Sequence, residues 1–381
     1  MNFQPSEAQV LAVDSWRKAI VNEVVPITRQ YLDRIIPKHE VKKLLKITTQ
    51  FGVGNGWVAA ADGGLGLDFV TSGLLYEALA EYSADLAGVC FVNEGAAAKI
   101  ASAASPAIRE RYLQPTLAGD LIGCSAISEP DTGSDVRAMR TTATAVDGGY
   151  RLNGEKLWIS NSSVADYVVV TAATGDNAFT MFLVDREEHG FDVREIDKLG
   201  LNGWSLGQIS FSDVFVPDEN RLGDVGAGLR ETMKGFERSR CFISLLGLGL
   251  GQAALHAAID YAQQRRQFGK EIGKHQLVQQ LLAEMAVELE ASRLMVFKGL
   301  SALDVGTGSN IEASMAKMFA TEAMVRVTHK AIQVHGAFGI SQEFPLERYF
   351  RSARMLTIPD GTTQINTLIV GRYLTGFSAF S

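Results

Sequence analysis

The chain has 381 residues, enough for two or three domains, and 46% hydrophobic and 21% charged residues, as in a globular protein. These fractions exclude disorder, collagen and disulfide-rich miniproteins. The 36 basic and 43 acidic side chains give a net charge of −7. Such a chain is not a general nucleic-acid binder, because it cannot neutralise many phosphates. A local basic pocket for a ligand with a few phosphates stays compatible with it.

The three cysteines, Cys90, Cys124 and Cys241, are too few and too scattered for a disulfide framework, which predicts a reducing, cytoplasmic compartment. The first residues contain no cationic segment followed by an apolar run, so no signal peptide is expected. The most apolar stretch, Cys241–Ala258, is interrupted by a serine, three glycines, a glutamine and a histidine. It predicts a buried helix, and no membrane partner is expected.

Along the chain, the hydrophobic period changes twice. From Ser6 to about Gly119, apolar residues recur at three- and four-residue steps, which predicts helices. From Leu121 to about Gly223 the pattern is that of strands separated by glycine-rich turns. Short β-branched and aromatic runs mark these strands at Tyr167–Ala172, Phe179–Val184 and Gln208–Phe215.

From about Leu229 helices return. A long apolar stripe extends from Leu277 to Leu300, and further helices are predicted at Asn310–His335 and Thr362–Leu374. The order favours a small β-domain between two helical domains, an α+β fold that is mainly α, with boundaries at 1–120, 121–228 and 229–381.

The sequence motifs of several common enzyme classes are absent. The sequence contains no HExxH or P-loop and no clustered Cys and His, so no metal site is predicted. Gly247, Gly249 and Gly251 form GLGLG, but no strand precedes them. Close helix packing therefore explains these glycines better than a Rossmann phosphate loop does.

Two segments suit a nucleotide. The loop Ala126–Asp135, AISEPDTGSD, offers hydroxyls and main-chain N–H groups for a polar ring or a phosphate, although an ordinary hydrogen-bonded turn has the same composition. In Tyr261–Gln276, Arg265 and Arg266 stand beside Phe268 and a glycine turn, which suits a pyrophosphate next to a stacked ring. A solvated loop between helices fits that pattern equally well.

A third segment, Ile358–Arg372, places Asp360 on a Pro-Asp-Gly turn and Thr362 at the cap of the helix that follows. A carboxylate that points from such a turn into a cavity acquires a raised pKa and can act as a base. A lone aspartate at a helix start more commonly faces water. The residues alone leave both interpretations open.

Together and in this order, these segments resemble the acyl-CoA dehydrogenase family. The resemblance spans nearly the whole chain and rests on collinear motifs. They are GGLGL at 63–67, SEPDTGSD at 128–135, LNGEKLWISN at 152–161, FERSR at 236–240, YAQQRRQFGK at 261–270, AIQVHGAFGI at 331–340 and DGTTQI at 360–365. Each motif alone is weak evidence, but their joint occurrence is specific.

The resemblance implies an N-terminal helical domain, a central β-barrel and a C-terminal four-helix bundle, in a homotetramer or dimer with FAD near a subunit interface. It also implies which residues contact this cofactor. Expected at the flavin ring are Ile127, Ser128, Trp158 and Ser160; expected at the pyrophosphate and adenosine, of a neighbouring subunit's cofactor, are Arg265, Gln267, Phe268 and Gln276; further cofactor contacts are Gln333, Ala337, Thr362 and Gln364. The family usually has glycine where this chain has Ala337.

The substrate is implied to be an acyl thioester. Ser134, Phe236, Glu237 and Arg240 fall where the family holds the thioester and its coenzyme A arm, with Arg240 near a phosphate or the adenine. Glu94 lies on a helix whose counterpart closes the acyl end of the pocket in some relatives.

The base is implied to be Asp360, where most relatives carry a glutamate. A minority place the base on the helix with FERSR, but Ser239 occupies that position and cannot serve. Asp360 is one methylene shorter than glutamate and reaches ~1.5 Å less, a displacement that changes rates by orders of magnitude if nothing compensates. Either the substrate or the main chain lies closer here, or the acyl group is not an ordinary linear one.

The implied reaction removes the α-proton by Asp360 while the β-hydrogen leaves as hydride to the flavin. The main-chain N–H of Asp360 and a ribityl hydroxyl bond the thioester oxygen, as an oxyanion hole does. Electrons then pass to an electron-transfer flavoprotein or to oxygen. Alternatives are an acyl group tethered to a carrier protein, a flavin oxidase, monooxygenase or lyase on the same scaffold, and a non-enzymatic helical protein that would lack a flavin spectrum.

Overall fold

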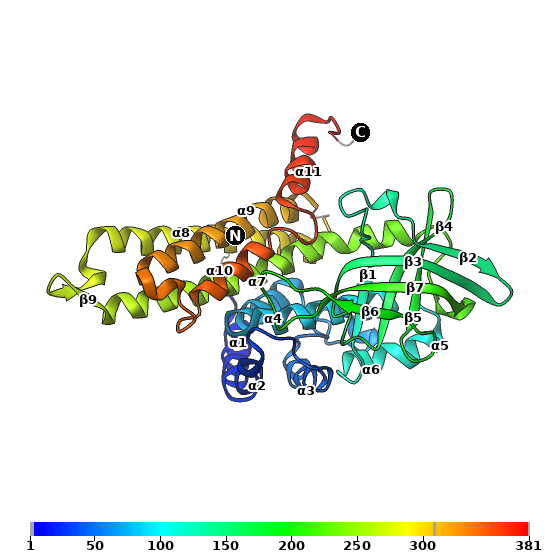
Figure 1. The fold of residues 1–381 in the computed structure, drawn as a ribbon, viewed down its shortest axis with the longest axis horizontal. Helices are drawn as coiled ribbons and strands as arrows, with labels where there is room; N and C mark the ends of the chain where they lie inside the picture. The colour runs from blue at the N-terminus through cyan, green and yellow to red at the C-terminus, as the bar shows by residue number, and fades with distance from the viewer. Residues whose placement is uncertain (1–3, 308–309, 380–381) are drawn as a thin grey trace.

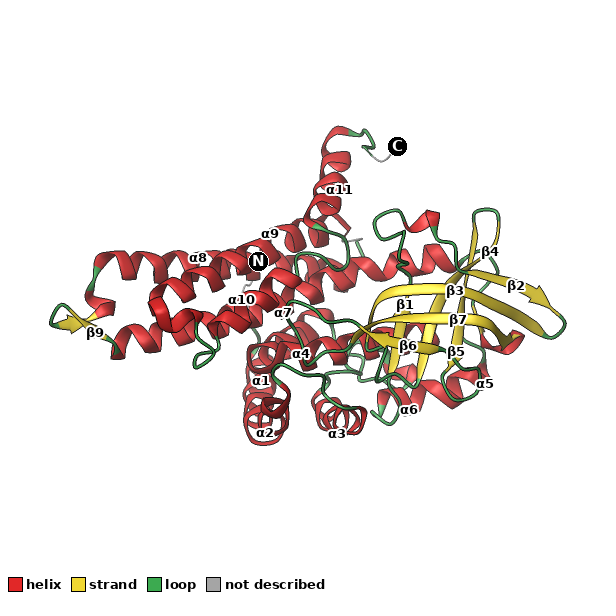
Figure 2. Cartoon of the chain, in the orientation of Figure 1, coloured by secondary structure: helices red, strands yellow, loops and turns green. Residues whose placement is uncertain are grey.

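The computed structural model describes residues 4–307 and 310–379. The molecule is elongated, with a long helical bundle at one end, a curled sheet at the other, and the N-terminal helices packed beneath the junction (Figure 1). Figure 2 separates the two kinds of secondary structure clearly. The fold is mainly helical with a central sheet, as the sequence predicts.

The N-terminal part is helical. Its helices are α1 (Glu7–Ala19), α2 (Val25–Thr28), α3 (Lys38–Thr48), α4 (Phe69–Ala103), α5 (Pro106–Ile108) and α6 (Gln114–Leu117). Ser6 begins α1 with a capping box, in which Gln9 N donates to Ser6 Oγ at 3.3 Å and Ser6 N donates to Gln9 Oε1 at 2.8 Å. Asp68 caps α4 by accepting from Thr71 N at 2.6 Å. α4 is kinked at Ser83, where the main chain leaves the helical region.

The central part is an eight-stranded sheet. The strands are β1 (Gly123–Ala126), β2 (Thr142–Val146), β3 (Gly149–Ser160), β4 (Tyr167–Gly175), β5 (Ala178–Asp185), β6 (Asp192–Glu195), β7 (Leu206–Pro217) and β8 (Arg221–Leu222). Their order is β6-β7-β3-β2-β4-β5-β8, and β1 pairs in parallel with β4. The three predicted strand runs are confirmed as parts of β4, β5 and β7. Inward side chains of these strands form a core of their own.

Helices return after β8. They are α7 (Gly228–Gln264), α8 (Gln276–Val305), α9 (Asn310–His335), α10 (Leu346–Met355) and α11 (Thr363–Thr375), with a small hairpin of β9 (Arg266–Gln267) and β10 (Lys270–Glu271) between α7 and α8. The predicted helix at Asn310–His335 is confirmed by α9. α11 projects away from the bundle, toward the top of the view in Figure 1.

Helix α7 is the axis of the molecule and runs from the sheet to the far tip of the bundle (Figure 1). The GLGLG glycines lie inside it, and the packing explanation is confirmed. A Cβ on Gly249 would lie 2.5 Å from the main chain of Ala80, and one on Gly251 would lie 2.2 Å from Sδ of Met324. α7 is long and apolar enough to cross a membrane by composition, but 72% of its apolar window is buried inside the protein.

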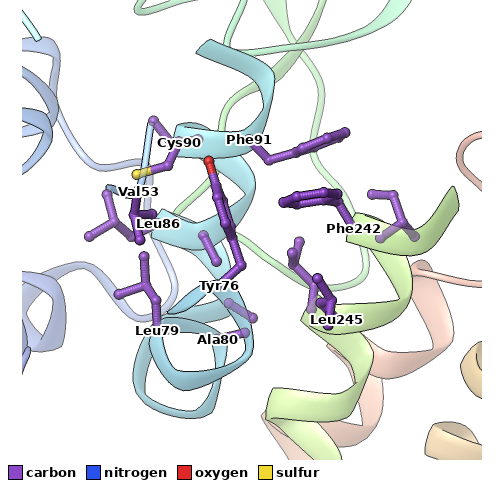
Figure 3. Packing of buried hydrophobic residues seen from close by; sticks show 14 of the residues in the cluster. Val53, Tyr76, Leu79, Ala80, Leu86, Cys90, Phe91, Phe242 and Leu245 are labelled. Carbon is purple, nitrogen blue, oxygen red and sulfur yellow. The ribbon is translucent and has the colours of Figure 1, made fainter. Parts of the chain in front are cut away.

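Aromatic rings join α4 to α7. Phe242 stacks on Phe91 with ring centroids 5.3 Å apart and meets Tyr76 edge-on at 4.9 Å. Figure 3 shows the three rings in one layer between the two helices. Trp57 adds a further edge contact to Phe242 at 6.3 Å. This layer fixes the distance between α4 and α7 on the side where the candidate site lies.

Candidate active site at the Asp360 turn

The turn that carries Asp360 lies between α10 and α11 and faces the N-terminal half of α7. The main chain is left-handed at Asp360, with φ of 57°, a conformation that aspartate tolerates better than most residues. The Ser239 hydroxyl donates to Oδ2 of Asp360. Nε of Arg240 donates to the main-chain oxygen of Asp360 at 3.3 Å. Two adjacent residues of α7 therefore hold both the carboxyl group and the main chain of the expected base.

Lys317 on α9 holds the same turn from another side. Its side chain is buried, and Nζ donates to the carbonyl oxygens of Thr357 and Gly361, each at 2.7 Å. Asn366 on α11 also donates to the carbonyl oxygen of Gly361, at 2.8 Å. Hydrogen bonds from a charged donor are stronger than neutral ones. Lys317 therefore fixes the main chain on both sides of Asp360.

The electrostatics favour a proton-accepting carboxyl group. Burial raises the pKa of Asp360 above the usual range of aspartate, and the Ser239 hydrogen bond and the charges of Lys317, Arg240 and Lys99 offset this only in part. Burial also lowers the pKa of Lys317 and of Lys99 to about 8. Asp360 still keeps some accessible surface. A partly accessible carboxyl with a raised pKa, fixed by three helices, suits general-base chemistry.

The residues expected at the flavin ring are brought together at the edge of the sheet. The loop after β1 lies along the end of β3, where Leu157 N donates to Ser128 O at 2.9 Å and Lys156 Nζ donates to Ile127 O at 3.0 Å. The register of β3 against β7 shifts between Lys156 and Ile159, and within this bulge Trp158 has a φ of 63°. A bulge re-aims a side chain, and Trp158 is 57% exposed. Ser160 ends β3 and is half-buried.

A buried ion pair locks this loop to the sheet. Nζ of Lys156 lies 2.8 Å from Oε1 of Glu129, and both side chains are almost completely buried. Glu129 also accepts from the main-chain N–H groups of Arg140 and Thr141, at 2.6 and 2.9 Å. Burial opposes ionisation of Glu129, but these hydrogen bonds lower its pKa overall. The pair holds the polar loop in one conformation beside Trp158.

The residues at this edge fit a flavin ring. The hydroxyl of Thr132, in the polar loop, is buried and has no hydrogen-bond partner within the described residues. A buried donor without a partner is uncommon in a native structure, and a bound polar ring would supply one. The exposed face of Trp158 provides an apolar surface nearby. Ile127, Ser128, Trp158 and Ser160 would therefore hold the ring, with the loop hydroxyls at its polar atoms.

The other expected cofactor residues lie at the far end of α7. Arg265, Gln267, Phe268 and Gln276 are exposed, and the Phe268 side chain is 94% exposed on the β9–β10 hairpin. Gln333 and Ala337 reach the same end, because His335 between them stacks on Tyr261 of α7 at 4.2 Å. Figure 1 places this hairpin at the opposite tip of the molecule from the sheet.

Thr362 and Gln364 instead follow the Asp360 turn. Thr362 caps α11 by accepting from Ile365 N at 3.3 Å, and Gln364 is exposed. The structure thus divides the expected cofactor residues into a near group at the sheet and the Asp360 turn and a far group at the hairpin.

The expected substrate residues divide as well. Phe236 and Glu237 are half-buried on α7 beside the Asp360 turn, while Ser134 is exposed in the polar loop. Arg240 differs from the expectation of a cation near a phosphate. It is buried, and besides Asp360 its Nη1 bonds Asn310 Oδ1 at 2.5 Å and Ser314 Oγ at 3.3 Å. Arg240 therefore holds the turn, because its position on α7 faces α9 rather than solvent.

Glu94 is completely buried on α4. Its carboxyl group accepts from Trp57 N at 2.8 Å, Gly54 N at 3.2 Å and the Tyr76 hydroxyl at 2.7 Å. Burial raises its pKa to about 7, against the effect of these hydrogen bonds and of the charge of Arg238. Glu94 thus anchors the loop that carries Trp57 next to the aromatic layer of Figure 3.

Sequence reasoning missed Lys317, Lys156, Lys99 and Arg238. Lys156 and Arg238 lie inside the quoted motifs LNGEKLWISN and FERSR, so a signal for them was present. Lys317 and Lys99 lie in ordinary helical runs, where a lysine normally marks the solvated face. Only the three-dimensional packing shows that both face the Asp360 turn.

Comparison with known proteins shows the family of the chain. Three family models match in series: Acyl-CoA dehydrogenase, N-terminal domain, over residues 6–120, the middle domain over 124–214, and the C-terminal domain over 226–375. Benzylmalonyl-CoA dehydrogenase of Aromatoleum aromaticum is 38% identical over 314 residues, which cover 81% of this chain and 83% of that protein.

Two further proteins extend the comparison. Subunit CarC of the caffeyl-CoA reductase-Etf complex of Acetobacterium woodii is 33% identical over 359 residues, covering 91% of this chain and 94% of that protein. The structure of butyryl-CoA dehydrogenase from Megasphaera elsdenii superposes with a TM-score of 0.92 at 30% identity, covering 98% of this chain and all of that one.

The chain therefore belongs to the acyl-CoA dehydrogenase family, whose domain models together match most of its length. Its enzymatic class is that of an FAD-dependent acyl-CoA dehydrogenase.

Proposed function

We propose that this protein forms an α,β double bond in an acyl thioester, acyl-CoA in the first place, with Asp360 as the base that removes the α-proton. One observation carries the proposal. Asp360 sits on a left-handed turn with a raised pKa, and side chains from α7, α9 and α11 hold that turn. No other carboxyl group within the described residues combines partial accessibility, a raised pKa and contact with the motif FERSR.

In this reaction the chain's own residues bind, orient and deprotonate the substrate. Asp360 accepts the α-proton, and its raised pKa makes the carboxylate a stronger base near neutral pH. The Asp360 main-chain N–H donates to the thioester oxygen, where negative charge develops. When bound, FAD takes up the hydride that leaves the β-carbon. Lys317 and Arg240 hold the turn so that the carboxyl group and the N–H point to one substrate.

The division of the cofactor residues supports an oligomer. Ser239 and Gln264 are separated along α7 by ~38 Å at ~1.5 Å per residue, which is longer than an extended flavin dinucleotide. One cofactor bound at Trp158 cannot also contact Phe268 of the same chain. We propose that the far group serves the pyrophosphate and adenosine of a cofactor bound by a second copy of the chain, in a homo-oligomer.

The C-terminal helix gives independent support for association. Tyr373 and Leu374 of α11 and the following Phe377 are 66%, 72% and 81% exposed, and α11 stands clear of the bundle (Figure 1). Exposed apolar side chains gathered on one element mark an interaction surface. A second copy of the chain that covers α11 would bury them.

For the electron acceptor, an electron-transfer flavoprotein is the proposal that the comparisons favour. The Acetobacterium woodii relative is a subunit of a caffeyl-CoA reductase-Etf complex. Oxygen is the alternative acceptor. The rate at which air reoxidises the reduced enzyme distinguishes the two.

Anaerobic titration of the yellow protein with acyl-CoA and acyl-carrier thioesters tests the proposed function. Bleaching of the flavin by an acyl-CoA supports it. Asp360→Asn should keep the flavin and slow its bleaching ~10²–10⁴-fold, which is the usual contribution of a general base. Unchanged bleaching by the variant would exclude Asp360 as the base, and bleaching only by carrier-bound groups would change the substrate class.

A further inference from the structure

Arg238 is a half-buried cation that the proposed reaction does not use. It lies on α7 next to Ser239, and its guanidinium group stacks over the ring of Trp57, with Cζ 3.8 Å from the centroid. Its Nε is buried and has no hydrogen-bond partner among the described residues. Within the described residues no carboxylate oxygen lies within ion-pair distance of it. A buried charged donor without a partner is costly and calls for an explanation.

Arg238 lines a cavity of about 170 Å³ between α4 and the loop of Trp57. Apolar and small side chains make up most of the wall, namely Trp57, Val58, Ala59, Phe69, Ala98 and Ala101. One turn away on the same face of α4, a Cβ on Gly95 would meet nothing within 4 Å. Small-molecule sites typically measure ~300–1,000 Å³, so this cavity suits one short end of a ligand.

Two residues of the cavity wall are followed in the sequence by residues that act on the base. Ser239, which donates to Asp360, directly follows Arg238. Lys99 directly follows Ala98, and the charges of both Arg238 and Asp360 act on it. A thioester whose α-carbon lies at Asp360 can therefore extend its acyl group toward Arg238.

The carboxyl groups at this place already have partners, whereas Arg238 does not. Glu94 accepts three hydrogen bonds, from Trp57 N, Gly54 N and the Tyr76 hydroxyl. Asp62, which also lines the cavity, forms an ion pair with Arg109. Burial lowers the pKa of Arg238 to about 10, and Glu94 opposes this only through space. The cavity thus presents an unmatched positive charge to whatever enters it.

We propose that this cavity binds a carboxylate at the distal end of a short acyl group, so that the preferred substrate is the thioester of a dicarboxylic acid. The inference rests on the proposed function, because the acyl group is placed by Asp360. The planar guanidinium group can bond a carboxylate with two parallel hydrogen bonds. Stacking on Trp57 fixes the guanidinium plane, and the contact of Trp57 with Phe242 fixes the ring. Lys99, whose charge interacts with those of both Arg238 and Asp360, adds a second positive charge near the base.

Matched thioesters test this inference, because each pair differs only in a terminal methyl or carboxylate group. The pairs are butyryl- and succinyl-CoA, valeryl- and glutaryl-CoA, and hexanoyl- and adipoyl-CoA. Binding is measured by calorimetry on the flavin-loaded Asp360→Asn protein, which holds substrate without turnover. Flavin bleaching on the wild-type protein supplies kcat/KM for the same pairs.

One dicarboxylyl thioester should bind at least ~10-fold more tightly than its partner. Arg238→Met should reduce that ratio ~10²-fold or more, since loss of a buried charge partner costs ~2–5 kcal/mol. Arg238→Lys should keep part of the preference. Arg230→Met, on the exposed face of the same helix, is the control and should leave the ratio unchanged.

Equal or weaker binding of every dicarboxylyl thioester by the Asp360→Asn protein overturns the inference, whatever the wild-type protein turns over. Arg238→Met also overturns the inference if it lowers the affinity for both members of each pair equally. Arg238 would then bind a part that all the thioesters share, such as a coenzyme A phosphate. Dicarboxylyl preference in binding without bleaching of the wild-type flavin would support the pocket and contradict the proposed function.

Discussion

The two ends of α7 differ in how their functional residues are held. At the near end, Asp360 is fixed by Ser239, Arg240 and Lys317 within one chain. At the far end, Arg265, Gln267 and Phe268 stand exposed on a small hairpin. Proton transfer needs a geometry that is set before the substrate binds. At the near end, residues of a single chain set that geometry. The far end gains its contacts only when a ligand or a second copy covers it.

The largest effect is expected when the Asp360 turn at the near end loses one of the side chains that hold it. Lys317→Met removes the ammonium group that bonds Thr357 O and Gly361 O. The Asp360 turn should then shift, and because small displacements of a reacting group cost ~10²-fold, flavin reduction should slow by about that factor. Stopped-flow bleaching under anaerobic conditions measures it.

The matched control on α9 is Thr321→Val. Thr321 is buried one turn from Lys317, and its hydroxyl bonds only inside the helix, to Lys317 O at 2.8 Å. The rate of flavin reduction by this variant should stay within about twofold of the wild-type rate. If the two variants slow the reaction equally, the effect belongs to α9 packing and not to the turn.

The far end should respond in cofactor affinity. Arg265→Ala combined with Gln267→Ala should weaken FAD retention ~10–100-fold, as expected for loss of charge-assisted hydrogen bonds to a phosphate. The FAD dissociation constant after reconstitution of the apoprotein measures this. Lys270→Ala on the same hairpin is the control, because its Nζ already bonds Lys274 O at 3.3 Å.

Mixed oligomers make the far-end test sharper. When the Asp360→Asn chain and the Arg265→Ala, Gln267→Ala chain are combined, some sites receive Asp360 from one chain and an intact hairpin from the other. Activity should reappear in the mixture if the hairpin serves a second copy's cofactor. Absence of recovery in a verified mixed oligomer would place both groups in one chain's site.

Features of the fold and of the site that depend on local sequence signals could be predicted. Hydrophobic periods predicted the helix–strand–helix order, and they placed α9 because its apolar pattern is a local signal. The Asp360 turn was also visible, since Pro-Asp-Gly and Thr362 are local.

The residues that hold that turn were not visible. Lys317 bonds carbonyl groups 40 and 44 residues further along the chain, and no short window contains both partners. In FERSR, sequence favoured Arg240 for the ligand. Successive residues on a helix point ~100° apart, and the packing of α7 turns Arg240 toward α9 and Arg238 toward the cavity.

Helix α7 connects both ends, so its packing should affect stability more than chemistry. Gly249→Ala forces a Cβ to 2.5 Å from the Ala80 main chain and should cost about 1–3 kcal/mol. Gly235→Ala, on the same helix, meets nothing within 4 Å and should add about 0.5–1 kcal/mol, because alanine favours helices over glycine. Thermal unfolding of the two variants should move in opposite directions, and a shared direction would contradict the packing of α4 on α7.

The smallest expected effect is a pH shift at the near end. Asp360 must be ionised to accept a proton, so the rate of flavin reduction should rise with pH through its pKa, which burial has raised. Ser239 donates to the carboxylate and thereby lowers that pKa. Ser239→Ala should raise the pKa further and move the rising limb of the pH–rate profile to higher pH.

The plateau rate at high pH separates this charge effect from a geometric one. With the carboxylate fully ionised, Ser239→Ala should approach the wild-type rate, because Arg240 and Lys317 still hold the main chain of the turn. Ser244→Ala is the control, since that buried hydroxyl bonds Arg240 O within α7 at 2.7 Å and does not reach Asp360. A limb that stays in place while the plateau falls would mean that Ser239 positions the carboxyl group and does not tune its proton affinity.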